Sequence, residues 1–263
     1  MIFLAKKNVK RLLAVMRALA PQPPASKAVK DFAVRILMYH SVGGKPSDHR
    51  LAVRVPVERF EAQLKELRGL GYVTVTVSEA IASGLDTEPD RAVALTFDDG
   101  YKDNFTTAAP LLRSMGMKAT FFITTAHICG KARQKWADGS PREYMGWEDV
   151  KALAGMGFEI GSHMIDHVDL TSLSDTDLKA QLELSRQDIA RNLGKAPDVM
   201  SYPYGKLDER VIAMAGKAGY KAACSSFAGL NCAATNPCIL RRTEIDGYDT
   251  ISDFRSKLAG LYD

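Results

Sequence analysis

From residue 34 to residue 260 the chain alternates short apolar runs with amphipathic segments. Apolar runs of four to eight residues are typical of buried strands, and apolar positions three and four apart are typical of helices. Strands are predicted over 34–39, 72–77, 92–97, 119–124, 157–161, 199–202 and 220–224. Helices are predicted over 57–69, 78–83, 104–115, 147–155, 174–193, 207–217 and 250–260. This alternation predicts βαβ units, a parallel sheet and an α/β fold.

The number and spacing of these units favour one closed or nearly closed barrel over two separate domains. We therefore predict a single TIM-barrel-like domain over residues 31–263. The predicted helix 174–193 carries its own boundary signals. Ser174 followed by Asp177 resembles a capping box, and Gly194 stands where the helix should end.

Residues 1–30 are predicted to form a separate N-terminal segment, a basic amphipathic helix followed by a Pro-rich linker. Residues 1–20 resemble a secretory signal, but Arg17 shortens the apolar stretch below the length that such a signal needs. We favour a helix that makes peripheral contact with an anionic membrane surface, with a packed or frayed helix as the alternative. The predicted location is the cytoplasm or the inner face of the membrane, and export stays open.

Composition restricts the possible partners of the chain but does not indicate a reaction. The net charge of +4 over 263 residues, without clusters that mix basic and aromatic residues, argues against a nucleic-acid partner. The four cysteines contain no Cys-x-x-Cys pair, which favours free thiols, although one or two disulfides in an exported protein stay open.

Polar residues that can do chemistry follow four of the predicted strands directly. His40 ends the first, Asp98 and Asp99 follow 92–97, His163 and His167 follow 157–161, and Pro203 and Tyr204 follow 199–202. The carboxyl ends of the strands in a parallel barrel share one face, where such folds place their active sites. These residues are therefore expected to meet.

His163 and His167 stand four residues apart, a spacing common in metal sites. With one nearby carboxylate they form a mixed nitrogen and oxygen set that suits Zn²⁺ or another divalent transition metal. Such a set also explains two adjacent aspartates, because one can bind the metal while the other takes a proton from the attacking water. The alternative is an ordinary Asp-Asp-Gly turn after a strand.

The segments "TFDDG", "SHMIDH" and "YPYG" together resemble the polysaccharide deacetylase family, the NodB-homology fold of carbohydrate esterases, over about residues 34–260. The resemblance implies a distorted (β/α)₇ barrel that removes acetyl groups from N-acetylated sugars with a divalent metal. It implies Asp98 as general base and Asp99, His163 and His167 as metal ligands. It also implies that the Tyr204 amide, in the turn with Pro203, helps to hold the oxyanion.

The sequence departs from the family pattern at two places. The third motif usually begins with an Arg that pairs with the base, but Ser201 stands two residues before Pro203. Arg241 or Arg242 of "LRRTEID" is the predicted substitute, with surface charge as the alternative. No C-terminal Leu-x-x-His segment supplies the usual general acid.

The N-terminal "MYHSV" resembles instead the circularly shifted branch that includes exported poly-N-acetylglucosamine deacetylases. His40 is therefore the predicted acid, and a histidine that only forms a structural hydrogen bond is the alternative. Trp136 and Trp147 could stack on a sugar ring, although Trp147 fits a packed position better. Asp166 could orient one of the two metal-binding histidines.

The predicted function is metal-dependent hydrolysis of the N-acetyl group of a polysaccharide, oligosaccharide or lipid-linked glycan, with release of acetate. Two alternatives stay open. One is deacylation of another amide, such as a formamido sugar on a lipid carrier, and the other is a carbohydrate-binding barrel without activity. No motif in the sequence indicates the length of the glycan.

Overall fold

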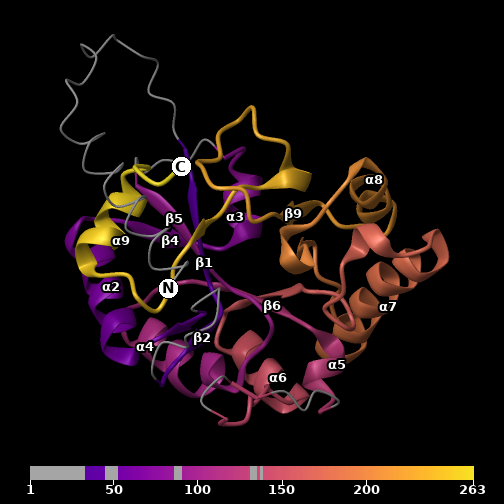
Figure 1. Cartoon of the computed structure of the whole chain (residues 1–263), viewed down its shortest axis with the longest axis horizontal. Helices are drawn as coiled ribbons and strands as arrows, with labels where there is room; N and C mark the ends of the chain where they lie inside the picture. Colours follow the sequence, from indigo (N-terminus) through magenta and orange to yellow (C-terminus); the bar gives the residue numbers. More distant parts are fainter. Residues whose placement is uncertain (1–32, 45–52, 86–90, 131–134, 137–138) are drawn as a thin grey trace.

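The structure is a computed structural model that describes residues 33–44, 53–85, 91–130, 135–136 and 139–263. The predicted N-terminal segment lies outside the described residues. The described part forms a curled parallel sheet surrounded by helices (Figure 1). The predicted α/β, barrel-like fold is therefore confirmed.

The main sheet has eight parallel strands. Seven of them follow the order β10-β1-β5-β6-β7-β8-β9. The eighth, β4, pairs with the first half of β5, and β6 pairs with the end of β5. A parallel bridge between Cys224 and Leu240, three residues before β10, connects the two ends of this order. The strands are β1 (Arg35–Tyr39), β4 (Val73–Val75), β5 (Ala92–Phe97), β6 (Thr120–Ile123), β7 (Glu159–Ser162), β8 (Val199–Ser201), β9 (Ala222–Cys224) and β10 (Thr243–Glu244). A separate parallel pair consists of β2 (Ser41–Val42) and β3 (Arg54–Val55).

Helices form the outer ring of Figure 1. They are α2 (Val57–Gly69), α3 (Val77–Ala82), α4 (Ala109–Ser114), α5 (Thr125–Ile128), α6 (Trp147–Gly155), α7 (Asp175–Leu193), α8 (Glu209–Lys217) and α9 (Ile251–Leu258). The predicted ends of α7 are confirmed, because the Ser174 hydroxyl accepts from the Asp177 amide and Gly194 has the left-handed φ of 74°. The shorter helical turns are η1 (Asn104–Ala108, a π-helix), η2 (Leu170–Ser172), η3 (Pro203–Gly205) and η4 (Pro237–Ile239).

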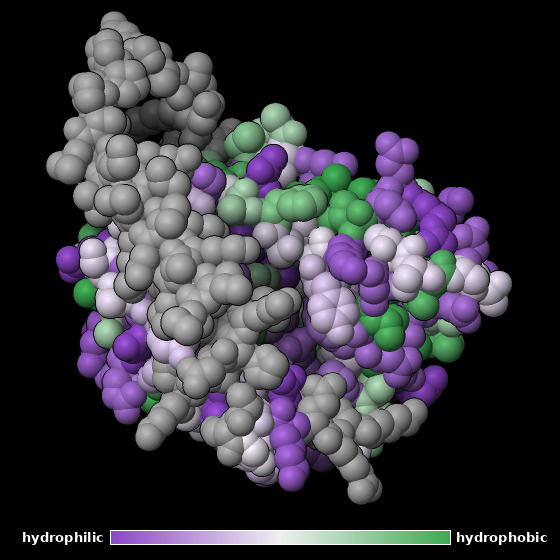
Figure 2. Space-filling model, viewed as in Figure 1, coloured by the Kyte–Doolittle hydropathy of each residue, from purple (hydrophilic) through white to green (hydrophobic). Residues whose placement is uncertain are grey.

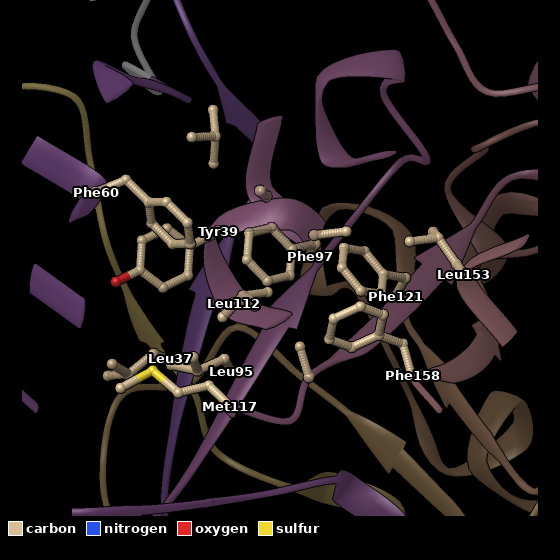
Figure 3. Packing of buried hydrophobic residues seen from close by; sticks show 14 of the residues in the cluster. Leu37, Tyr39, Phe60, Leu95, Phe97, Leu112, Met117, Phe121, Leu153 and Phe158 are labelled. Atoms are coloured by element: carbon tan, nitrogen blue, oxygen red, sulfur yellow. The ribbon is translucent and has the colours of Figure 1, made fainter. Parts of the chain in front are cut away.

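The largest core cluster contains alternate side chains of β1, β5 and β6 and residues of the surrounding helices (Figure 3). A row of rings runs through it, with Phe97 stacked on Tyr39 at 5.3 Å and on Phe121 at 4.8 Å between centroids. The intervening residues of β1 and β5, such as Ile36 and Ala94, belong to a second buried cluster. Burial of both faces explains why these strands are almost wholly apolar.

The surface follows from the same amphipathic pattern. On the face shown in Figure 2, hydrophilic side chains spread around the rim, and hydrophobic ones gather in small patches near α7 and α8. Within the described ranges, the helices are too short or too polar to cross a bilayer. All four cysteines have free thiols.

Several elements differ from the prediction. The short strands β2, β3 and β10 and the helix α5 were not predicted, because two to four residues show no measurable periodicity. The predicted helix 104–115 begins instead as the π-helix η1. The other predicted strands and helices are present, and their ends lie within two residues of the predicted ones.

Candidate active site

A cavity of about 380 Å³ lies at the carboxyl ends of the strands. It is lined by side chains that come from the ends of β1, β5, β7 and β8 and from the segment before β10. The predicted site residues that line it are His40, Asp98, Asp99, His163, His167, Tyr204 and Arg242. The prediction that the polar residues at the strand ends lie together is therefore confirmed.

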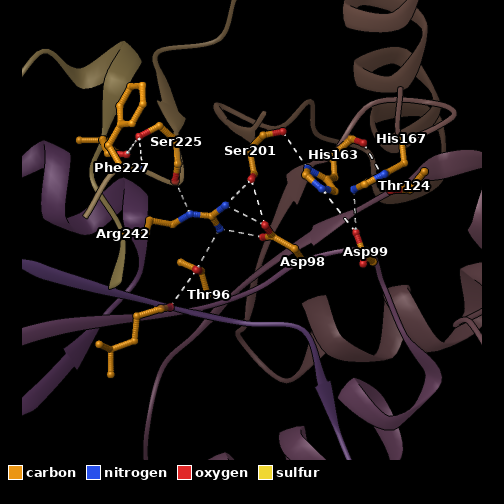
Figure 4. Close-up of polar contacts among 12 residues, drawn as sticks. Thr96, Asp98, Asp99, Thr124, His163, His167, Ser201, Ser225, Phe227 and Arg242 are labelled. Atoms are coloured by element: carbon orange, nitrogen blue, oxygen red, sulfur yellow. Dashed lines mark hydrogen bonds and ion pairs between the residues drawn. The ribbon is translucent and has the colours of Figure 1, made fainter. Parts of the chain in front are cut away.

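Asp99, His163 and His167 offer ligand atoms that all lie within 4.8 Å of one another. Asp99 Oδ1 lies 3.4 Å from His163 Nε2 and 3.2 Å from His167 Nε2 (Figure 4). This oxygen is buried and has no hydrogen-bond partner of normal geometry among the described residues. A buried carboxylate oxygen between two imidazole nitrogens is a fitting place for a divalent cation.

A hydrogen bond on the side of the ring away from Asp99 fixes the orientation of His163. Its Nδ1 lies 2.8 Å from the Ser201 carbonyl oxygen, which can only accept a hydrogen bond. Nδ1 therefore carries the proton, and Nε2 presents its lone pair toward Asp99 when the ring is neutral. Metal-binding histidines in proteins are commonly held in this way.

The backbone around these residues is unusual. Asp99 has a φ of 75° and His167 a φ of 52°, values that are costly for residues with a Cβ atom. Such conformations persist where the surrounding structure imposes them, and they concentrate at functional sites. Here they turn side chains from two different strand ends toward one point.

Charges in the cavity shift the pKa values of the three residues. Burial opposes ionisation of Asp99, but its close contacts with the neighbouring histidines outweigh burial and hold the pKa of Asp99 far below its usual range. Burial and the charge of His163 lower the pKa of His167 to about 4. For His163, the charges of Asp98 and Asp99 overcome burial and raise the pKa. Asp99 is thus ionised and His167 unprotonated at neutral pH, the forms that bind a cation. The raised pKa of His163 favours a proton on its ring, which a bound cation would displace.

Asp98 points away from this cluster and forms a buried ion pair with Arg242 (Figure 4). The pair is bidentate, with Arg242 Nη1 at 2.8 Å from Oδ1 and Nη2 at 2.7 Å from Oδ2. The Ser201 hydroxyl donates to Asp98 Oδ2 at 3.1 Å and accepts from Arg242 Nη2 at 2.8 Å. Burial disfavours the charged form of Asp98, but Arg242 and His163 outweigh it and lower the pKa of this carboxyl.

Of the two predicted arginines, only Arg242 lies in the cavity. Arg242 is 2% exposed and also donates to the Ser225 carbonyl. Arg241 is exposed, and its guanidinium donates to the Ala228 carbonyl. The structure thus places Arg242, and not Arg241, beside Asp98, because neighbouring residues on an extended segment point to opposite sides.

His40 lies at the end of β1 on the cavity wall. Its carbonyl oxygen accepts from Asn104 Nδ2 at 2.7 Å, which ties this strand end to η1. Its Nδ1 is buried, and no described residue gives it a hydrogen bond. The structure thus places His40 in the same cavity as Asp98 and Asp99 without assigning its imidazole to a structural hydrogen bond.

The turn η3 after β8 presents Tyr204 and Gly205 to the cavity. Tyr204 has a φ of 59° and is 60% exposed, and its ring lies edge-on to His167 with 4.5 Å between the ring centroids. Pro203 is buried in the same turn and does not line the cavity, so the predicted contact of its side chain with substrate is not supported.

The comparisons with known proteins agree with this geometry. Residues 86–223 match the family model described as polysaccharide deacetylase. YxkH of Bacillus subtilis (strain 168), whose name refers to the same family, is 33% identical over 218 residues, which cover 82% of this chain and 72% of YxkH. The chain belongs to the polysaccharide deacetylase family.

As a member of this family it is a carbohydrate N-deacetylase, a hydrolase. The poly-β-1,6-N-acetyl-D-glucosamine N-deacetylase of Staphylococcus aureus is 25% identical over 177 residues, or 64% of this chain and 59% of that protein. The solved structure of the Streptococcus pyogenes deacetylase PplD, in complex with acetate, has a TM-score of 0.74 at 22% identity and covers 86% of this chain and 98% of PplD. The structural match supports the same fold.

One wall of the deacetylase cavity consists of aromatic residues that the sequence did not bring together. Tyr101 packs against Trp136 at 5.2 Å and Tyr144 at 5.1 Å between centroids, and His127 packs on Tyr144 at 4.3 Å. All four line the cavity. They come from the segment after β5, from α5 and from the segment before α6, so no spacing in the sequence could indicate them. Trp147 instead packs against the main core, as the sequence favoured.

Proposed function

We propose that this deacetylase removes the N-acetyl group of an N-acetylated glycan and depends on a divalent metal, with Zn²⁺ the best match. The proposal rests on one observation, the cluster of Asp99, His163 and His167 beside an ionised Asp98 in a single cavity. The three residues would hold the metal, and no thiolate is among them. When bound, such a metal polarises a carbonyl oxygen and lowers the pKa of water.

Asp98 is suited to act as general base. The bidentate contact with Arg242 keeps it ionised, and Oδ1 accepts only from Arg242 in the described residues, which leaves a lone pair on this oxygen. Asp98 would take a proton from the attacking water while the water oxygen forms its bond to the acetyl carbon. The amide carbonyl oxygen then becomes negatively charged.

His40 is suited to protonate the leaving group. It lines the same cavity, and its imidazole has no described structural partner at Nδ1. As the carbon–nitrogen bond breaks, His40 would donate its proton to the sugar nitrogen, so that a free amine and acetate result. The left-handed turn at Tyr204 would place its amide against the oxyanion, where one such donor is worth about 3 kcal/mol.

The nature of the glycan is inferred from two sources. The relatives include a poly-N-acetylglucosamine deacetylase, and the cavity volume suits a ligand of about sugar size. Aromatic side chains on its wall offer flat faces to a sugar ring. These features support an N-acetylhexosamine unit within a longer glycan, with lipid-linked glycans as a variant of the same chemistry.

The test is acetate release from N-acetylglucosamine oligomers and lipid-linked N-acetyl sugars by the zinc-loaded enzyme. Asp98→Asn should reduce turnover by at least about 10²-fold and keep the metal, because the base contributes on that order. His163→Ala should lose both turnover and metal. Full activity in Asp98→Asn would refute the assignment of the base, and release of acetate from none of the glycans would refute the substrate class.

A further inference from the structure

The loop that carries both histidines has a backbone that requires support. Between β7 and η2, Met164 has a φ of 66° and His167 a φ of 52°. Each left-handed residue with a Cβ atom costs about 1–2 kcal/mol. The loop also leaves the pairing pattern of the sheet, so its backbone groups need other partners.

Two different helices supply these partners. The amides of Thr125 and Ala126, in α5, donate to the carbonyls of Met164 and Ile165 at 3.0 Å each. From the other side, Gln181 of α7 uses its Oε1 to accept from the amides of Ile165 at 3.0 Å and Asp166 at 3.2 Å. The carbonyls of the loop are thus held by α5 and two of its amides by one side chain.

Further hydrogen bonds from α7 also hold this loop. Gln181 Nε2 donates to Asp166 Oδ2 at 2.9 Å. One helical turn further, Ser185 accepts from the Ser162 hydroxyl at 3.0 Å, and Ser162 in turn accepts from the Met164 amide at 3.2 Å. Asp166 thus contacts Gln181, and the predicted role of Asp166 in orienting one of the histidines would be carried by this contact.

We propose that Gln181 is a positioning residue that sets the loop for His167, and this inference rests on the metal site of the proposed function. His163 does not need it, because its amide donates to the Ile123 carbonyl at 2.8 Å and its ring is held by Ser201. His167 lies beyond the two amides that Gln181 holds and is 21% exposed. Loss of Gln181 should therefore displace one metal ligand of three and leave the barrel intact.

The first test compares Gln181→Leu with Gln187→Leu, the same change at an exposed position of the same helix. Apo-protein is titrated with Zn²⁺ against a chromogenic chelator, and with Co²⁺ to record the visible absorption of the metal site. Gln181→Leu should weaken metal affinity by about 10–100-fold, the usual effect of an outer partner of a ligand. It should also change the Co²⁺ spectrum, while Gln187→Leu should match the wild type.

A second pair of variants keeps the inference testable if Gln181→Leu does not fold. Gln181→Glu still accepts from the two amides but repels Asp166, and adding Asp166→Asn restores a donor to the carboxylate. The double variant should therefore bind Zn²⁺ at least several-fold more tightly than Gln181→Glu alone.

Two results would overturn the role of Gln181: wild-type affinity and spectrum in Gln181→Leu, or equal affinity in the single and double exchange variants. Neither reading depends on turnover. A wild-type protein that binds Zn²⁺ but releases no acetate from any glycan would refute the proposed function and leave the role of Gln181 standing.

Discussion

At the scale of the residue, the ion pair of Asp98 with Arg242 is the contact that most directly controls the chemistry. Both groups are almost fully buried, so removing one partner leaves an uncompensated charge. In Arg242→Gln the positive charge that lowers the pKa of Asp98 is lost, so burial should raise this pKa. The acid limb of the kcat/KM profile should then move to higher pH. Activity at neutral pH should fall by at least about 10²-fold. A pH profile of acetate release measures both effects.

The sign of the stability effect follows from the same shift. Because the pKa of Asp98 is lowered on folding, the pair stabilises the fold above the ordinary pKa of Asp98 and loses this contribution as pH falls through the folded value. Arg242→Gln should therefore be less stable than wild type at pH 7. Arg241→Gln is the matched control and should change stability by less than about 0.5 kcal/mol and leave the profile unchanged. Equal damage in both variants would contradict the assignment of Arg242.

At the scale of the element, the turn η3 shows how a neighbouring segment fixes the site. Gly205 has a φ of 65°, and a Cβ atom there would lie 1.8 Å from Ser226 Oγ and 3.0 Å from the Ser226 amide nitrogen. Gly205→Ala should therefore displace the turn and the adjacent Tyr204 amide, and kcat should fall by at least about 10-fold. Acetate-release kinetics test this expectation.

Gly194 is the matched glycine for this experiment. It has a φ of 74° at the end of α7, and a Cβ atom there would meet nothing within 4 Å. Gly194→Ala should cost only about 1–2 kcal/mol in urea unfolding and leave kcat unchanged. If Gly205→Ala retains the wild-type kcat, the turn does not place a catalytic group.

Elements with a clear period could be predicted from the sequence, and those defined by distant contacts could not. The apolar strand β5 and the amphipathic helices α2 and α6 have the predicted bounds. The two-residue β10 exists only because it pairs with β1, and η1 departs from an α-helix where Asn104 reaches the His40 carbonyl. Neither contact leaves a local pattern.

The candidate site divides in the same way. Residues at the ends of long apolar runs, such as Asp99 and His163, could be placed on one face because parallel strands share an edge. The choice between Arg241 and Arg242 depends on how the segment before β10 is turned, which tertiary structure sets. Gln181 gives no signal at all, since a glutamine in an amphipathic helix is ordinary.

At the scale of the whole molecule, a metal held by Asp99, His163 and His167 would join the ends of β5 and β7, which lie on either side of β6. An ion that binds only the folded barrel stabilises it by mass action, by about 2.7 kcal/mol at one hundred times the dissociation constant. For a domain of this size, that corresponds to a rise in Tm of about 5–10 °C.

Removal of the metal with a chelator should therefore lower the Tm by this amount, and added Zn²⁺ should restore it. Asp98→Asn should keep the metal-dependent shift, because Asp98 faces Arg242 and does not belong to the cluster. Asp99→Asn, which removes the charged ligand with little change in shape, should abolish it. A wild-type Tm that does not respond to metal would show that the three side chains do not bind a cation, since any ion held across two strand ends must stabilise the fold that brings them together.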